Sequence, residues 1–295
     1  MRRAWLVIPC VLFIVLAFLD VESFIAGGRA GFALFSSNVL PVLFPFFLVT
    51  SLLVELDMFR RLPRLGVFVF GLVGGYPTSA RILAELYERG QITRESAIRT
   101  ATYSCVPSPI FMIATVGVAL YGSVALGVMI FVSVVVGALF NGLLYRRITM
   151  YSVQTMNADK LVPREFDFAR ALQSSIQAIL SVGGLIVVFF IMAHQVGAVF
   201  GLPSVLDVGF AGVLEMTTGV FRASDHMPHG ISVGGLLVPV AILAFGGLCV
   251  GMQGFIFLQR IGMRFRFYLL MKVTHTVLSL LVGSVLLYGH KFLFS

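Results

Sequence analysis

Four short segments of the chain combine helix-breaking residues with polar side chains inside apolar sequence. The first, residues 71–81, reads GLVGGYPTSAR. Glycines permit sharp turns, and Pro77 suits the first turn of a following helix. Free N–H groups at such a helix start attract anions, and Thr78 and Ser79 add hydroxyls. The segment therefore predicts a binding turn, with a plain helix break packed against a neighbour as the alternative. The residues assigned to binding are Gly74, Gly75, Pro77, Thr78, Ser79 and Arg81.

The second segment, residues 104–111, reads SCVPSPIF. Two prolines two positions apart in an apolar stretch break a helix and leave carbonyl oxygens without helical partners. Ser104 and Ser108 can then supply polar contacts to a solute. A proline kink repaired by the serine hydroxyls is an equal alternative.

The third segment, residues 214–219, reads LEMTTG. A carboxylate within a membrane is costly and is by default a candidate functional group. Glu215, with Thr217 and Thr218 beside it, can bind a proton, a cation, or a substrate amine or hydroxyl. A structural ion pair with Arg222 is the alternative.

The fourth segment, residues 245–254, reads FGGLCVGMQG. Gly246 and Gly247 permit an unwound backbone, and Gln253 offers a neutral donor and acceptor inside a span. We assign these three residues to the site. Close helix packing through small residues is the alternative, because glycines also stand four positions apart at 247 and 251.

A further pair of polar residues, Lys272 and His275, lies one helical turn apart in the last apolar stretch. Long basic side chains near helix ends extend their charge to the lipid headgroups. We therefore expect Lys272 at the membrane surface.

The composition shows which elements must hold these residues. The chain has 295 residues, of which 59% are hydrophobic and 12% are charged, and its mean hydropathy is +1.00. A soluble domain carries about 25% charged residues. This composition therefore argues against a soluble enzyme, a secreted disulfide scaffold and a coiled coil. It is typical of a polytopic membrane protein. The net charge of +8 comes from basic clusters between apolar stretches, which indicates topology signals rather than nucleic acid binding.

The apolar stretches predict about seven membrane spans, since a crossing helix needs about 20 apolar residues. Two further stretches are broken by glycine, proline and polar residues, and they contain the first and third motifs. The predicted spans are residues 4–19, 32–57, 100–120, 124–145, 172–197, 236–258 and 270–289, and the broken stretches are residues 66–86 and 208–235.

The basic clusters predict the orientation, because positive charge gathers on the cytoplasmic side. We place Arg2 and Arg3 in the cytoplasm and treat both broken stretches as re-entrant hairpins. Only Arg29, Arg222 and Lys291 of the 21 basic residues then lie outside. Treating either stretch as a full span would reverse the sides of the basic clusters that follow it.

The predicted elements repeat in order: span, hairpin, span, span. The first series begins outside and the second begins inside, so the two are inverted repeats, which mark secondary transporters whose site lies where hairpin tips and broken helices meet. The expected divisions are an N-terminal span and external loop (1–31), a first repeat with its gate hairpin (32–147), a cytoplasmic linker (148–171) and a second, inverted repeat (172–295).

Taken together, the motifs resemble the nucleoside-recognition or Gate domain family of membrane proteins. The resemblance is carried by GGYP at 74–77, ELYERGQI at 85–92, SPIF at 108–111, EMTTG at 215–219 and FGGL at 245–248, followed by Met252 and Gln253. It implies a fold related to concentrative nucleoside transporters. For the sporulation branch of the family it also implies movement of dipicolinate in endospore formers.

We therefore expect an all-α polytopic membrane protein with two inverted repeats, about seven spanning helices and two re-entrant hairpins, related in fold to concentrative nucleoside transporters. It would carry a small polar or anionic solute, with dipicolinate as the specific expectation, across the cell membrane or a spore membrane. Glu215 would couple a proton or a sodium ion. No cofactor or metal is expected, and no nucleic acid partner. A homo-oligomer is compatible with the sequence.

Three alternatives to this reading differ in function. A gate or scaffold module would move no solute, and a related carrier would take nucleosides instead. An intramembrane enzyme is not expected, because the sequence contains no HExxH motif, and its GxSxG match, GISVG at 230–234, does not follow a predicted strand.

Overall fold

The computed structural model describes residues 11, 13–15, 17–59, 63–146, 166–200, 203–226 and 231–294, without the side chains of 197–200, 293 and 294. Within these ranges all regular secondary structure is helical. Most of the predicted linker over 148–171 and most of the predicted span over 4–19 lie outside the described residues.

The first half of the chain starts with a long helical segment. Asp20 caps its beginning, because the carboxylate accepts a 2.9 Å hydrogen bond from the backbone N–H of Ser23. This bond lowers the pKa of the Asp20 carboxyl. The elements are α2 (Val21–Leu34), the π-helical turn η1 (Phe35–Val39), α3 (Leu40–Glu55), α4 (Pro63–Gly74), α5 (Tyr76–Glu88), α6 (Arg94–Ser104), the π-helix η2 (Ile110–Leu120) and α7 (Val124–Leu144).

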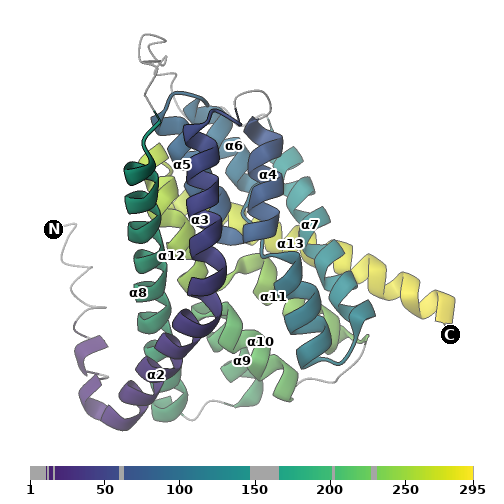
Figure 1. Ribbon diagram of the computed structural model, residues 1–295. Coiled ribbons are helices and arrows are strands. Elements are labelled where there is room, and N and C mark those ends of the chain that lie inside the picture. Colours follow the sequence, from purple (N-terminus) through teal and green to yellow (C-terminus); the bar gives the residue numbers. More distant parts are fainter. Residues whose placement is uncertain are drawn as a thin grey trace.

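The second half follows the same order of elements. A long helix is followed by a hairpin of two short helices, a broken helix and a second long helix. The elements are α8 (Phe168–Phe200), α9 (Ser204–Leu214), α10 (Met216–His226), η4 (Val233–Leu237), α11 (Val238–Phe245), α12 (Gly247–Leu258), η5 (Gln259–Ile261) and α13 (Phe265–Phe294). Figure 1 shows α3 and α8 side by side, with α9 and α10 at the lower end and α13 crossing behind and extending beyond the body.

Five helical segments of the described chain are long and apolar enough to cross a bilayer: Val21–Glu55, Val124–Leu144, Phe168–Val196, Val233–Ile261 and Phe265–Phe292. They overlap five of the predicted spans and confirm the class of an all-helical polytopic membrane protein. The first of them begins at Val21, so residues 21–31, which were predicted to lie in an external loop, are helical. The stretch 100–120 is not one continuous helix, because the irregular backbone over 105–108 divides it into α6 and η2.

Small residues let the long helices approach closely. A Cβ atom at Gly27 would lie 2.8 Å from the Cα of Ile191, and one at Gly31 would lie 2.9 Å from the Cβ of Phe190. The spacing of these glycines is that of a small-residue packing motif. Helix α2 therefore packs against the backbone of α8.

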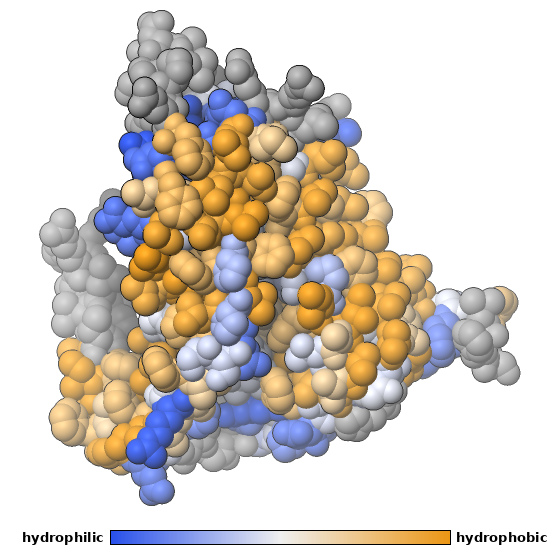
Figure 2. Space-filling view, in the orientation of Figure 1, coloured by the Kyte–Doolittle hydropathy of each residue, from blue (hydrophilic) through white to orange (hydrophobic). Residues whose placement is uncertain are grey.

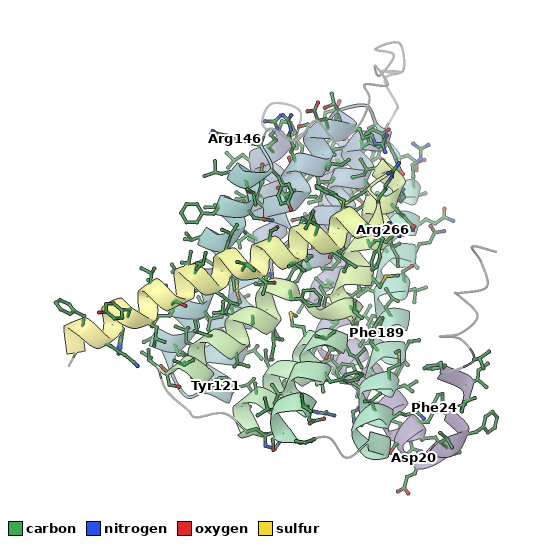
Figure 3. The ribbon with its side chains drawn as sticks, turned by 180° about the vertical axis from the view of Figure 1, so that it is seen from behind. Asp20, Phe24, Tyr121, Arg146, Phe189 and Arg266 are labelled. Atoms are coloured by element: carbon green, nitrogen blue, oxygen red, sulfur yellow. The ribbon has the colours of Figure 1, made fainter. Side chains whose placement is uncertain are left out.

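The surface has the pattern of a protein embedded in lipid. Figure 2 shows apolar residues over most of one face, with hydrophilic residues gathered toward its upper and lower ends. In Figure 3, Arg146 lies at the upper end of the bundle and Arg266 lies in its upper half, while Asp20 and Tyr121 lie toward the opposite end. This distribution agrees with the predicted sides of these residues relative to one another. Which end faces the cytoplasm stays a prediction.

Candidate functional site

Each of the four motifs contains a helix break. Gly75 separates α4 from α5 with φ 81° and ψ −171°, and Gly246 separates α11 from α12 with φ 83°. Only glycine adopts these angles without strain. Glu215 separates α9 from α10 in an extended conformation, and residues 105–108 separate α6 from η2. The breaks therefore lie where glycine, proline and the buried acid predicted them.

A cavity of about 340 Å³ lies where three of these breaks meet. Its walls come from η1, α3, α5, η2, α8, α10 and α12, and most of the wall is apolar. Among its described lining residues, Glu215 is the only charged one. The predicted binding residues on its wall are Gly75, Pro77, Ser108, Glu215, Thr217 and Gln253.

Other predicted binding residues lie behind this wall, where their hydroxyls form hydrogen bonds with the backbone around the helix breaks. The Ser79 hydroxyl donates a 2.7 Å hydrogen bond to the carbonyl oxygen of Ser104, so it joins the first hairpin to the second break. The Thr78 hydroxyl donates to the carbonyl oxygen of Gly74 at 3.0 Å. Both hydroxyls are therefore engaged within the protein. A direct contact of these residues with a solute stays a prediction.

Gly246 and Gly247 also lie behind the cavity wall, where they permit close approach. A Cβ at Gly246 would lie 3.1 Å from the Cζ of Tyr76, and one at Gly247 would lie 3.0 Å from the backbone nitrogen of Met216. The fourth break therefore packs against the tips of both hairpins.

The guanidinium of Arg81 lies deeper in the protein and does not reach the cavity. Its side chain is 2% exposed, and one nitrogen lies 2.8 Å from a carboxylate oxygen of Glu85. Another donates a 2.6 Å hydrogen bond to the carbonyl oxygen of Phe47. Arg81 is among the residues predicted to bind the solute, but in this conformation its guanidinium pairs with Glu85.

The carboxylate of Glu215 forms the start of α10. It accepts hydrogen bonds from the backbone nitrogens of Thr217 at 3.0 Å and Thr218 at 2.7 Å, and from the Thr218 hydroxyl at 3.0 Å. The alternative ion pair with Arg222 is wrong, because Arg222 pairs with Asp207. The second hairpin therefore supplies its own anion at the helix start, whereas α5 begins at Gly75 without a side-chain cap.

Asn38 lines the cavity from η1 but is not among the binding residues predicted from sequence. A π-helical turn inside an α-helix often marks a functional site. The signal was present as Ser36, Ser37 and Asn38 in a row within an otherwise apolar span.

The expectation that Lys272 reaches the membrane surface is wrong. This residue is 3% exposed, and its Nζ lies 4.5 Å from the centre of the Tyr76 ring. It also lies 3.5 Å from the carbonyl oxygen of Cys105 and 3.4 Å from Nδ1 of His275. No carboxylate of a described residue forms an ion pair with it. A buried lysine amine thus lies directly behind the cavity wall.

The part of the chain that the structure describes brings together no three histidine, cysteine, aspartate or glutamate side chains that could hold a metal ion. The polar groups on the wall are instead hydroxyls, amides and the one carboxylate. Such groups recognise a small polar solute through hydrogen bonds.

Comparison with known proteins gives one informative match. The chain is similar to a sporulation protein. It is 25% identical to "Sporulation integral membrane protein YlbJ" of Bacillus subtilis strain 168, over 81% of this chain and 71% of that protein. No family model matches the chain, and no solved structure matches it. The predicted resemblance to YlbJ-like sporulation proteins is thereby confirmed. The Gate domain assignment and the likeness to nucleoside transporters stay predictions.

Proposed function

We propose that this chain is an integral membrane transporter of a small polar or anionic solute. The observation that carries the proposal is the cavity of about 340 Å³ at which both hairpin tips and a proline-broken helix meet. Irregular backbone at membrane depth is tolerated only where it is buried in protein or lines a cavity. In this protein the irregular backbone lies beside a cavity that has hydroxyl and amide groups on its wall. This position favours a role in solute binding over a purely structural role for the helix breaks.

The proposed architecture is that of two inverted repeats with re-entrant hairpins. Both halves have the same order of elements. The first helices of the two hairpins, α4 and α9, have 12 and 11 residues. At about 1.5 Å per residue each is shorter than 20 Å, against about 30 Å for the hydrocarbon core. These lengths support hairpins that enter and leave on the same side of the membrane. The basic clusters add a cytoplasmic N-terminus to the proposal.

The two hairpin tips suggest the charge of the solute. The start of α5 is uncapped and faces the cavity through Gly75 and Pro77, and a helix start favours an anion. The start of α10 already holds the carboxylate of Glu215, which would repel an anion. We therefore propose an anionic solute whose uptake is coupled to a proton or a sodium ion that neutralises Glu215.

Dipicolinate is the first solute to test. YlbJ is described as a sporulation protein, and the resemblance to the sporulation branch of the family implies dipicolinate as the solute. Its two carboxylates suit the uncapped helix start. A role in spore formation, in a cell membrane or a spore membrane, is part of this proposal.

The test is uptake of labelled dipicolinate into liposomes that contain the purified chain, with protein-free liposomes as the control. We expect saturable uptake that unlabelled dicarboxylates compete away and that a lower pH or added sodium increases. If uridine or adenosine blocked uptake at concentrations where dicarboxylates did nothing, a nucleoside carrier would replace the proposal. Failure to accumulate any of these solutes would favour the scaffold alternative.

A further inference from the structure

A second cavity, of about 520 Å³, lies at the other end of α5. Its wall is far more polar than that of the first cavity. It contains Ser51, Glu85, Ser174, Gln177 and Arg260. None of these residues belongs to the binding set predicted from the motifs.

The two cavities are lined by the same four helices at successive levels. On α3 the wall passes from Leu43 in the first cavity to Ser51 in the second. On α5 it passes from Pro77 to Glu85. Each step is eight positions, which corresponds to about 12 Å along a helix. Helices α8 and α12 also contribute to both walls, and the four helices pack against one another (Figure 1). The cavities are therefore stacked along one path.

The layer between the cavities is closed by Phe47 and Arg81, which are 0% and 1% exposed. The guanidinium carbon of Arg81 lies 4.8 Å from the centre of the Phe47 ring. Together they close the path between α3 and α5.

The polar contacts of Arg81 in this layer join three helices. It pairs with Glu85 on its own helix. It also donates to the hydroxyl of Ser51 on α3 and, at 3.0 Å, to that of Ser175 on α8. The Ser51 hydroxyl in turn donates to Glu85 at 2.9 Å. Opening the layer therefore requires these bonds to break together.

We propose that the two cavities form one translocation path and that the Arg81–Glu85 pair is the closed gate between them. This inference rests on the proposed transport function. A guanidinium binds a carboxylate bidentately, so a carboxylate of the solute can take the place of Glu85 while the anion passes. An uncharged solute offers no such replacement. The gate thus selects for carboxylates as well as separating the cavities.

The experiment measures which side reaches each cavity, in a background without the native cysteines. Ser108→Cys reports the first cavity and Gln177→Cys the second. We expect a membrane-impermeant thiol reagent to modify the two cysteines from opposite sides. With Arg81→Gln and Glu85→Gln added, each cysteine should react from both sides, at a rate at least tenfold higher from the formerly closed side.

The matched control is the Arg99–Glu95 pair of α6, whose side chains are 33% and 45% exposed and line neither cavity. Replacing both residues by glutamine removes the same charges outside the layer and should leave the labelling unchanged. Modification of both reporters from one side in the parent would overturn the proposal, and so would an unchanged pattern in the Arg81/Glu85 variant.

A second measurement decides the matter if the Arg81/Glu85 variant does not fold. Cysteines at Ser51 and Ser174 can be joined by a short bifunctional thiol reagent across the layer. We expect the cross-link to stop uptake, and its reduction to restore uptake. Undiminished uptake by the cross-linked protein would refute the gate but leave transport intact, whereas a parent without uptake would refute the proposed function itself.

Discussion

The ammonium nitrogen of Lys272 lies 4.5 Å from the centre of the Tyr76 ring. Tyr76 begins α5 and lines the cavity, and its hydroxyl donates a hydrogen bond to the carbonyl oxygen of Leu243. One aromatic side chain therefore links the tip of the first hairpin to α11 and α13. The Tyr76 ring also separates the buried Lys272 amine from the cavity.

This relationship predicts the effect of Lys272→Met. In its protonated form, the Lys272 amine would attract an anion about 8 Å away by about 2 kcal/mol at an effective dielectric of about 20. We expect dipicolinate binding to weaken by roughly 10- to 30-fold. The midpoint of thermal unfolding should not fall, because methionine fills similar volume and removes a buried charge that has no carboxylate partner. Equilibrium binding and thermal unfolding in detergent check both points.

The control for this prediction is Lys291→Met, since Lys291 is exposed near the end of α13. It should bind dipicolinate like the parent. Equal affinity in both variants would show that the Lys272 charge does not act on the cavity.

We predict that Glu215→Gln reduces transport far more than Glu22→Gln. Glu215 is 3% exposed and caps α10, whereas Glu22 is exposed in the first turn of α2. Glutamine keeps one oxygen that can accept from the start of α10, so the loss of stability should stay below about 1 kcal/mol. Loss of the titratable group should abolish stimulation of uptake by acid. Liposome uptake at several pH values measures this. If both variants transport like the parent, Glu215 has only a structural role.

The topology prediction concerns Arg146 and Asp225, both of which are exposed. Arg146 lies at the end of the bundle opposite Tyr121 (Figure 3), and Asp225 lies close enough to Tyr121 to act on its hydroxyl electrostatically. Single cysteines at these two positions, in a background without native cysteines, should therefore label from opposite sides of the membrane. Labelling of both from the same side would contradict the inverted-repeat arrangement.

Gly246→Ala should destabilise the protein, because a residue with a Cβ in the left-handed conformation costs roughly 1–2 kcal/mol. The new Cβ would also lie 3.1 Å from the Tyr76 ring. Gly184 in α8 is the matched control, since a Cβ there meets nothing within 4 Å. In that helix interior alanine should stabilise by about 0.5–1 kcal/mol. Thermal unfolding compares the two, and equal midpoints would contradict the strain at Gly246.

The class of protein and the positions of the helix breaks could be predicted from sequence. A chain with 12% charged residues cannot cover a soluble surface, so composition alone indicates a membrane protein. The breaks at Gly75, Pro107, Glu215 and Gly246 follow from local backbone sterics and from the cost of an acid in apolar sequence. Both effects depend only on residues that are close together in the sequence, so they can be predicted without knowing which distant segments pack nearby.

The direction of individual side chains could not be predicted in this way. Arg81 and Pro77 lie on the same helix one turn apart, yet Pro77 lines the cavity and Arg81 pairs with Glu85 in the layer beyond it. Lys272 has the sequence context of a surface lysine but is buried against Tyr76. In both cases the outcome depends on how a helix is rotated against helices that are far away in the chain. Only the packing of those helices determines that rotation.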